Sequence, residues 1–330
     1  MPEAVARSRP VRELLVVELL GGIGDTLLAL PSVHALARAH PGAAVRVLTY
    51  DAGAELLDRD PHVTEVVAVP SDADPAAAVL AQLRRVPPDV AVTTTTHSGI
   101  ADLLTKHVAH AMTDLWQGPP PHALVDRRFL RLLAAAGLIH RADVDLPLRV
   151  HLAAAEEAAG RGDVPEGAPL VLVPGSGMAV KRWAVARWAA VAAAYPGPVL
   201  SVGEPVTGAR LLPPVTLRQL AAQLAAAGAA GGVAVGVDTG PLRLATAVGC
   251  PAVGLFGPSA AGRYGLSSAR SLSLQGLPGC DVRVPADFTT QDCWWEARCP
   301  LSGADPACMA DLSVADVLSA LRDLRGDRAA

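Results

Sequence analysis

The chain has 330 residues, which exceeds one ordinary domain and suffices for two domains with separate hydrophobic cores. Hydrophobic residues make up 51% of it and aromatic residues only 3%, so Ala, Val and Leu must fill those cores. The net charge of -4 supplies no basic face to replace phosphate counterions, which excludes nucleic acid as the main partner.

The N-terminal residues 1–10 are polar and contain no apolar segment, so we expect no signal peptide. No stretch approaches the length of a membrane span without charges, Pro or Gly. The sequence therefore predicts a soluble cytoplasmic protein with at most peripheral membrane contact.

Short apolar runs alternate with Ala- and Leu-rich helical stretches in the first half of the chain. Nearly continuous Val/Leu runs without polar alternation are typical of buried parallel strands. Residues 138–152 lack clear periodicity, so we place a domain boundary there, between residues 1–150 and 151–330. The first half is predicted to hold strands at 14–19, 44–49, 64–69 and 89–93 and helices at 26–39, 75–85 and 125–137.

A second strand–helix series follows, and a loop-rich region at 257–311 precedes a closing helix at 314–325. Two such series predict an α/β fold of two doubly wound, Rossmann-like domains that face each other across a cleft. Ligands in these folds bind at the carboxyl ends of the strands. The predicted strands are 170–173, 199–202, 233–237 and 252–256, and the predicted helices are 183–194, 217–227 and 241–248.

The first glycine-rich segment, Gly21-Gly22-Ile23-Gly24-Asp25-Thr26, joins the first strand to the first helix. Glycines allow a tight turn and a close approach of a ligand to the backbone. The dinucleotide fingerprint G-x-G-x-x-G is not matched. Asp25 is interpreted either as a helix N-cap or as a carboxylate placed to take a proton.

The segment 174–183 also lies between a strand and a helix. Ser176 and Gly177 leave backbone N–H groups exposed and Lys181 adds a mobile positive charge, which together predict a diphosphate cradle. The Gly-Lys-Ser/Thr ending of a Walker loop is absent. The alternative is a polar loop with an exposed Lys-Arg pair.

A third junction, Asp238-Thr239-Gly240, begins the next helix. Thr239 and Gly240 offer a hydroxyl and backbone donors at a helix N-terminus, where the macrodipole favours an anion. Arg243 lies one turn further and is placed to reach a phosphate in a bidentate manner. Asp238 is alternatively a simple N-cap.

Three Asp-x-Asp triplets, Asp58-Arg59-Asp60, Asp72-Ala73-Asp74 and Asp143-Val144-Asp145, resemble the cation-binding pattern of metal-dependent transferases. None lies beside a candidate phosphate loop, so we expect all three to be surface residues.

Four of the five cysteines fall in the last sixth of the chain, within 280–308. Four thiolates can hold zinc or iron tetrahedrally. The usual C-x-x-C pairs are absent, so disulfides or free thiols are the alternatives. Cys250, the fifth, is expected only to pack. The candidate ligands are Cys280, Cys293, Cys299 and Cys308.

Together these segments resemble the heptosyltransferase-type glycosyltransferases of family 9. The family's opening Gly-Asp-x-Leu-x-x-x-Pro is matched from Gly24 to Pro31. Its second motif is matched by Ser176, Lys181-Arg182-Trp183 and Trp188. The third is matched by Asp238-Thr239-Gly240, Gly249-Cys250-Pro251 and Phe256-Gly257-Pro258-Ser259.

The resemblance implies a GT-B fold and an inverting transferase that needs no catalytic metal. It implies that Asp25 is the general base, that Lys181 contacts the donor phosphate and that the Asp238 loop binds diphosphate and ribose. Glu204 is the one acid near the place of the family's ribose-binding carboxylate. The implied donor is a nucleotide sugar, most simply ADP-heptose. In one branch of the family a similar Cys-rich segment holds iron.

The acceptor side is expected to involve Gly22, Gly24 and His97, with Ser98, Lys106 and residues 116–122 as further candidates. A glycan, a glycolipid and a small natural product are all compatible acceptors.

Two departures from the family pattern leave alternatives open. Arg243 replaces the family's His, and the stretch 202–216 is short. A sugar-nucleotide epimerase of the same architecture and a degenerate nucleotide-binding protein are the alternatives. A nicotinamide dehydrogenase would use Asp51 on the second strand, but its glycine fingerprint is missing.

Overall fold

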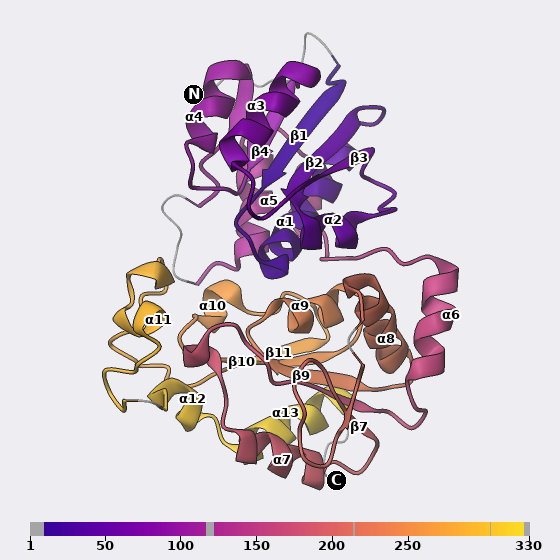
Figure 1. Cartoon of the computed structure of the whole chain (residues 1–330), viewed down its shortest axis with the longest axis vertical. Helices are drawn as coiled ribbons and strands as arrows, with labels where there is room; N and C mark the ends of the chain where they lie inside the picture. The colour runs from indigo at the N-terminus through magenta and orange to yellow at the C-terminus, as the bar shows by residue number, and fades with distance from the viewer. Residues whose placement is uncertain (1–9, 117–121, 214, 304, 327–330) are drawn as a thin grey trace. The chain divides into compact units, whose positions relative to one another are not determined.

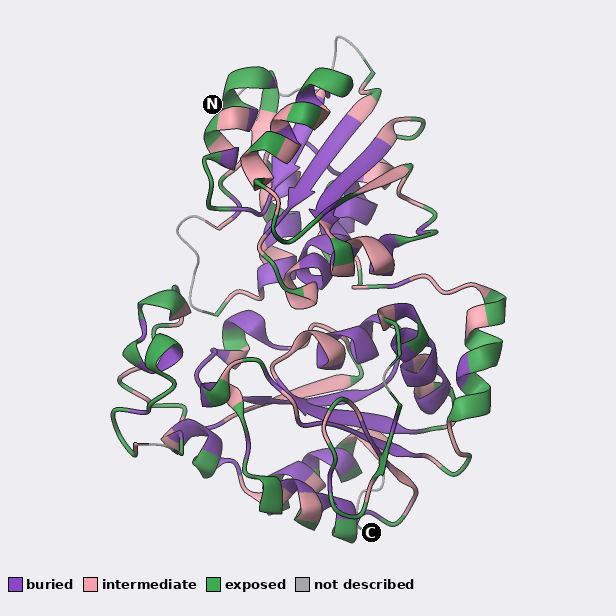
Figure 2. Cartoon of the chain, in the orientation of Figure 1, coloured by how far each residue is buried: buried purple, intermediate pink, exposed green. Residues whose placement is uncertain are grey.

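The computed structural model describes residues 10–116, 122–213, 215–303 and 305–326. These residues form two compact units. Unit 1 holds the described residues of Met1–Pro119 together with Val125–His151. Unit 2 holds those of Leu152–Ala330 and of Pro120–Leu124. Each unit has its own parallel sheet and its own hydrophobic core, drawn in Figures 1 and 2.

Unit 1 is a five-stranded sheet in the order β3-β2-β1-β4-β5, with every neighbouring pair parallel. Helices α1 (Ile23–Ala39), α2 (Asp51–Leu57) and α5 (Val125–Ala135) pack together on one face, and α3 (Pro75–Arg85) and α4 (Ile100–His107) on the other (Figure 1). The strands are β1 (Glu13–Glu18), β2 (Ala44–Tyr50), β3 (Glu65–Val69), β4 (Val90–Thr93) and β5 (His110–Met112).

Unit 2 is a six-stranded sheet in the order β11-β10-β9-β6-β7-β8, again parallel throughout. The strands are β6 (Leu170–Val173), β7 (Val199–Ser201), β8 (Arg210–Leu211), β9 (Val233–Val237), β10 (Ala252–Phe256) and β11 (Ser271–Gln275). The helices are α6 (Ala154–Asp163), α7 (Val185–Ala194), α8 (Leu217–Ala229), α9 (Gly240–Ala247), α10 (Ala261–Tyr264), α11 (Asp292–Glu296), α12 (Ala307–Asp311) and α13 (Val314–Arg325).

Burial explains why these strands lie at the centre of each unit. The central strands β6, β9 and β10 are buried along their whole length, as Figure 2 shows in purple, which fits apolar runs covered by helices on both faces. Trp188 and Trp183 meet edge to face in the core of unit 2 with ring centroids 4.9 Å apart. The core prediction from the Val/Leu runs is therefore confirmed.

The region 257–311 is more regular than the sequence predicted. It contains the edge strand β11 and three short helices, α10, α11 and α12. Among the described residues, no helix has the length and apolar character needed to cross a bilayer. Residues 1–9, on which the expectation about a signal peptide mainly rests, lie outside the described part of the chain.

Candidate functional site

The end of β1 is the topological switch point of unit 1, because β1 lies between β2 and β4. Gly21 leaves the strand with φ +114°, a conformation that favours glycine, and Gly22 is the N-cap of α1. The carbonyl of Gly22 accepts hydrogen bonds from the backbone N–H groups of Asp25 (3.0 Å) and Thr26 (3.3 Å). Asp25 therefore lies inside the first turn, and the interpretation of Asp25 as an N-cap is wrong.

Glycine at position 22 leaves room for the Asp25 side chain. A Cβ atom on Gly22 would lie 3.0 Å from Asp25 Oδ2, so the carboxylate folds back over the N-cap. The positive end of the helix dipole lies there and stabilises a negative charge. Gly24 lies in the same first turn, between the N-cap and Asp25.

A second carboxyl group, Glu18, lies directly below this turn and escaped the sequence analysis. Its Oε2 accepts hydrogen bonds from Thr26 Oγ1 (2.6 Å) and Thr49 Oγ1 (3.3 Å), and its Oε1 accepts one from the Leu20 N–H (3.0 Å). Burial, aided by the negative charge of Asp25, outweighs these hydrogen bonds and raises the pKa of Glu18 to about 7. In the sequence, the signal for this residue was an acidic side chain at the end of an otherwise apolar run.

His97 lies at the same edge of the sheet, in the loop after β4. Its Nε2 is 2.9 Å from the carbonyl oxygen of Leu19, and its Nδ1 is 2.9 Å from Ser98 Oγ. The predicted acceptor residues Gly22, Gly24 and His97 thus gather at the carboxyl ends of β1 and β4. Lys106 is exposed in the last turn of α4. Of the candidate stretch 116–122, residues 117–121 lie outside the described residues.

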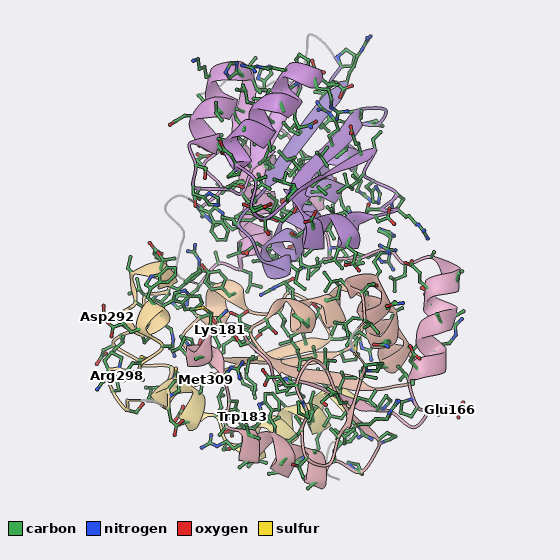
Figure 3. The ribbon with its side chains drawn as sticks, viewed as in Figure 1. Glu166, Lys181, Trp183, Asp292, Arg298 and Met309 are labelled. Carbon is green, nitrogen blue, oxygen red and sulfur yellow. The ribbon has the colours of Figure 1, made fainter. Side chains whose placement is uncertain are left out.

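In unit 2 the switch point lies between β6 and β9, and both candidate phosphate loops start there. Lys181 Nζ, from the loop after β6, donates to Asp238 Oδ2 (2.9 Å) and to the Asp238 carbonyl (3.1 Å). Ser259, after β10, donates its hydroxyl to the same Oδ2 at 2.7 Å. Lys181 also lies 4.8 Å from the centre of the Trp294 ring. Figure 3 labels Lys181 on its loop.

The charge of Asp238 is fixed by these partners. Burial alone would raise its pKa, but the positive charges of Lys181 and Arg243 and the hydrogen bonds from Ser259 and Lys181 lower the pKa below its ordinary value. Ser259 was quoted in the sequence motif but not assigned to the site. The structure places its hydroxyl on the central carboxylate.

Helix α9 begins at Gly240 without a side-chain cap. Its N-cap is Thr239, so the interpretation of Asp238 as the N-cap is wrong. The Thr239 hydroxyl donates back to the Val237 carbonyl at 3.2 Å and accepts no hydrogen bond from the first turn. This end of the helix keeps backbone donors for an anion.

Arg243 does not have the free guanidinium that the sequence led us to expect. Its side chain is 5% exposed, and its terminal nitrogens donate to the carbonyls of Tyr264 (2.6 Å) and Gly265 (3.4 Å). One of them lies 3.6 Å from Asp238 Oδ1. Arg243 therefore ties the end of α10 to α9 and presents its charge to Asp238 from inside the fold.

A cavity of about 420 Å³ lies at the carboxyl ends of β6 and β7. Glu204, after β7, pairs with Arg182 across its rim at 3.0 Å, and Gly175 leaves room for the Glu204 side chain. The Ser176 hydroxyl accepts the Met178 N–H at 3.1 Å, while Gly177 is exposed with open space around it. The lining is Pro174, Ala179, Arg182, Trp183, Ala184, Val185, Trp188, Glu204, Pro205, Val206, Asp305 and Pro306.

Four free thiols gather in the C-terminal segment of unit 2, where Cys280, Cys293 and Cys299 all act electrostatically on Cys308. The Cys299 sulfur accepts hydrogen bonds from Ser302 and from the backbone of Leu301 and Ala307, which lower its pKa against the effect of burial. Burial raises the pKa of Cys308 to about 11. Cys250 is buried elsewhere, beside Gly228, as a packing residue.

In two of the Asp-x-Asp triplets one aspartate is buried, while the other aspartate is exposed. Asp60 is 6% exposed and Asp143 is 5% exposed. Asp143 lies 3.3 Å from an Arg38 nitrogen, and Asp60 lies 2.9 Å from His34 Nε2. The expectation of three surface triplets is wrong because spacing alone carries no information about burial.

Part of unit 2 is similar to a known protein family. Residues 200–277 match Glycosyltransferase family 9 (heptosyltransferase), a segment that contains Asp238 and Ser259 but neither Lys181 nor Asp25. No curated protein matches the sequence.

Solved structures extend the likeness over nearly the whole chain. The glycosyl transferase family 9 protein from Veillonella parvula is 16% identical, with 96% of this chain and 98% of that chain covered and a TM-score of 0.77. E. coli ADP-heptose lps heptosyltransferase II is 18% identical, with coverages of 96% and 100% and a TM-score of 0.69. The iron-containing dodecameric glycosyltransferase TibC from enterotoxigenic E. coli is 14% identical, with coverages of 98% and 79% and a TM-score of 0.59.

These findings confirm three predictions made from the sequence: the resemblance to heptosyltransferase-type glycosyltransferases, the α/β fold of two parallel-sheet domains, and a glycosyltransferase as the class of enzyme. The cleft between the domains and the roles of individual residues stay predictions.

Proposed function

We propose that this chain, a glycosyltransferase similar to family 9, moves a heptose from an ADP-heptose-type donor to a hydroxyl group of a glycan, glycolipid or small natural product. One observation carries the proposal. Lys181, Asp238 and Ser259 meet beside the uncapped start of α9, at the switch point of unit 2. A diphosphate is the ligand that a lysine and free helix donors favour together.

Lys181 is prepared for this role by its partners. Asp238 occupies two of its three ammonium N–H groups, which holds the long side chain in place. The third N–H serves a phosphate oxygen of the donor. Charge on the leaving diphosphate grows as the glycosidic bond breaks, so a fixed ammonium group and helix dipole lower the barrier without a divalent cation. In this proposal Arg243 acts through Asp238 rather than on the phosphate.

The nucleoside is proposed to enter the cavity that Arg182 and Glu204 help to line, after β6 and β7. A volume of about 420 Å³ lies within the range of ligand pockets, roughly 300–1,000 Å³. The Glu204 carboxylate at the rim of the cavity pairs with Arg182 and also accepts hydrogen bonds from the ribose hydroxyls of the donor. Ser176 and Gly177 shape the loop that passes from this cavity towards Lys181.

Asp25 is the proposed general base. The acceptor oxygen attacks the anomeric carbon from the face opposite the diphosphate, its proton passes to Asp25, and the bond to the diphosphate oxygen breaks. This inverts the anomeric configuration. Gly22, Gly24 and His97 lie at the same sheet edge as Asp25 and form the proposed acceptor side.

The cysteine segment is proposed to hold a structural zinc or iron ion through Cys280, Cys293, Cys299 and Cys308. Four thiols are a donor set that both ions accept, and hydrogen bonds to the Cys299 sulfur favour its thiolate. The four sulfur atoms do not converge to ligand distance among the described residues, so the loops would have to close around the ion. Such an ion would cross-link loops and take no part in transfer. Metal analysis of protein purified without chelators, compared with a Cys280→Ser/Cys293→Ser variant, tests this.

The decisive experiment separates donor binding from transfer. ADP, GDP and UDP are first compared by thermal shift, and the affinity of the best ligand is measured by calorimetry. Lys181→Ala is expected to weaken that affinity at least 10-fold, because a charge-assisted contact is worth about 1.5–3 kcal/mol. Arg84→Ala, which removes an exposed cation of unit 1, is the control.

Asp25→Asn is expected to lower turnover roughly 100-fold to 10,000-fold and to leave nucleotide affinity unchanged, because the amide accepts no proton. Turnover at the wild-type rate would remove Asp25 from the mechanism. Equal affinity in wild type and Lys181→Ala would remove the diphosphate site.

A further inference from the structure

Three imidazole rings and one carboxylate meet inside unit 1, away from the residues assigned to transfer. His34 comes from the middle of α1, Asp60 and His62 from the segment between α2 and β3, and His151 from the end of the unit. The ring centroids are 4.8 Å apart for His34 and His62, 5.5 Å for His34 and His151, and 5.6 Å for His62 and His151.

The ligand-capable atoms of this cluster point at one another. One such atom from each of His34, Asp60 and His151 lies within 4.8 Å of the other two. His34 Nε2 is 2.9 Å from Asp60 Oδ2, and the other Asp60 oxygen accepts the backbone N–H of His62 at 2.9 Å. Ligand atoms of a tetrahedral ion with bonds of about 2.0–2.1 Å are separated by roughly 3.3 Å, so small side-chain movements close the set.

We infer that His34, Asp60 and His151 form a binding site for a late first-row divalent cation such as Zn²⁺, with His62 or water as the fourth ligand. Imidazole with one carboxylate selects zinc, nickel, cobalt or copper over magnesium or calcium. Among the described residues no other group of His, Cys, Asp and Glu ligand atoms converges to this distance, including the four C-terminal thiols.

The setting distinguishes this cluster from an exposed group of polar residues. The side chains of His34 and Asp60 are 6% and 3% exposed, so the first two ligands are already desolvated and held by the fold. His151 is half-buried and lies at the end of unit 1, where it closes the set from the solvent side. A buried ligand pair with one more accessible partner leaves a cation a route of entry.

The ion would have a structural role. His34 and Asp25 lie on the same helix, and at about 1.5 Å per residue the rise between them is roughly 14 Å. An ion bound to His34 does not reach the Asp25 carboxylate. It would instead tie α1 to the segment after α2 and to the last residue of unit 1.

The test uses the full chain, stripped of metal and titrated with Zn²⁺ alone. Wild type is expected to bind one more equivalent of Zn²⁺ than His151→Ala, and Asp60→Asn is expected to bind this equivalent on the order of 100-fold more weakly. His110→Ala, which removes an exposed histidine of unit 1, is the control and is expected to keep it. Any binding by the cysteines is common to all four proteins and drops out of the comparison.

Cobalt provides a second readout that does not depend on counting. Co²⁺ at the histidine cluster is expected to give visible absorption without the sulfur charge-transfer band that thiolates produce, and His151→Ala is expected to lose that component. His151 is only half-buried, so the His151→Ala variant is expected to fold, and circular dichroism of the metal-free variant checks this. If wild type and His151→Ala bind the same number of zinc ions, or give the same cobalt spectrum, the cluster binds no metal and is only a group of buried polar residues.

Discussion

Two carboxyl groups at the start of α1 have opposite surroundings. Asp25 lies in the first turn at the positive end of the helix, whereas Glu18 lies under it with 2% exposure. Two nearby carboxyl groups whose surroundings give them different pKa values commonly have different roles. Here Glu18 supports the turn by accepting the Thr26 hydroxyl, and below about pH 7 it holds a proton and adds no second negative charge beside Asp25.

The raised pKa of Glu18 predicts how the stability of unit 1 depends on pH. Below pH 4.5 the folded and unfolded chains both hold the proton. As the pH rises from 4.5 towards 7, only the unfolded chain releases it, so stability falls, and above about pH 7 the loss is complete. At about 1.4 kcal/mol for each pH unit, the loss is about 3 kcal/mol.

Glu18→Gln replaces the carboxyl group by an amide that does not ionise. The variant is expected to lack this loss, so that its stability relative to wild type is about 3 kcal/mol higher at pH 8 than at pH 4. Native-state hydrogen exchange of the β1 amides, corrected for intrinsic rates, measures this difference in stability. Asp72→Asn, which removes an exposed carboxyl group, is the control. The same difference from wild type at both pH values would contradict the prediction.

At the scale of whole elements, α6 and α8 show how small residues allow two helices to approach closely. Glu156 and Arg218 join them at one end through two 2.7 Å contacts, and Asp163 accepts a hydrogen bond from Gln223 at the other. Between these contacts, Gly160 faces the backbone of Ala222. A Cβ atom on Gly160 would lie 2.3 Å from the Ala222 carbonyl oxygen, which is backbone and has no rotamer to change.

Gly160→Ala is therefore expected to force the helices apart and to lower the free energy of unfolding by roughly 1–3 kcal/mol. Gly162→Ala is the matched control, because a Cβ atom there meets nothing within 4 Å. It is expected to be neutral or to stabilise by up to about 1 kcal/mol through helix propensity. Urea unfolding of unit 2 distinguishes them, and equal stability of the two variants would count against close α6–α8 packing.

The strands and helices of unit 2 show which elements the sequence can predict. Strands such as β6, β9 and β10 were predicted with their observed bounds, because each is a short run without a polar side chain. Helix α6 was missed because an Ala, Glu and Gly segment has no apolar stripe, and only Gly160 is buried in it. Edge strand β11 was missed because one sheet neighbour leaves its residues half-buried and its sequence alternates Ser and Leu.

Site residues divide in the same way. Lys181 and Asp238 were predicted because they follow strands at a switch point, and the fold brings them together. The buried position of Arg243 was not predictable from the sequence. It depends on hydrogen bonds to the carbonyls of Tyr264 and Gly265, which only the tertiary structure brings next to α9. The histidine cluster unites residues far apart in sequence, so no local pattern announced it.

For the whole molecule, the relevant property is that each unit has a separate core and a separate proposed ligand. Leu15, Val17 and Leu48 belong to one apolar cluster in unit 1, while Leu172, Val235 and Trp188 belong to another in unit 2. The proposed nucleotide site lies wholly in unit 2, and the proposed cation site of His34, Asp60 and His151 lies wholly in unit 1. A ligand that binds only the folded form stabilises whatever unfolds together with its site.

Separate cores predict separate responses to ligand. ADP at about 100 times its dissociation constant should stabilise unit 2 by about 2.7 kcal/mol, which slows hydrogen exchange of core amides in β6 and β9 roughly 100-fold. The amides of β1 and β2 should exchange at unchanged rates. In a Cys280→Ser/Cys293→Ser background, which removes the proposed cysteine site of unit 2, Zn²⁺ should produce the reverse pattern. Native-state hydrogen exchange followed by mass spectrometry resolves both units in one sample. If ADP slows β1 and β9 by the same factor, the two cores unfold as one, and stability must be assigned to the chain as a whole rather than to either unit.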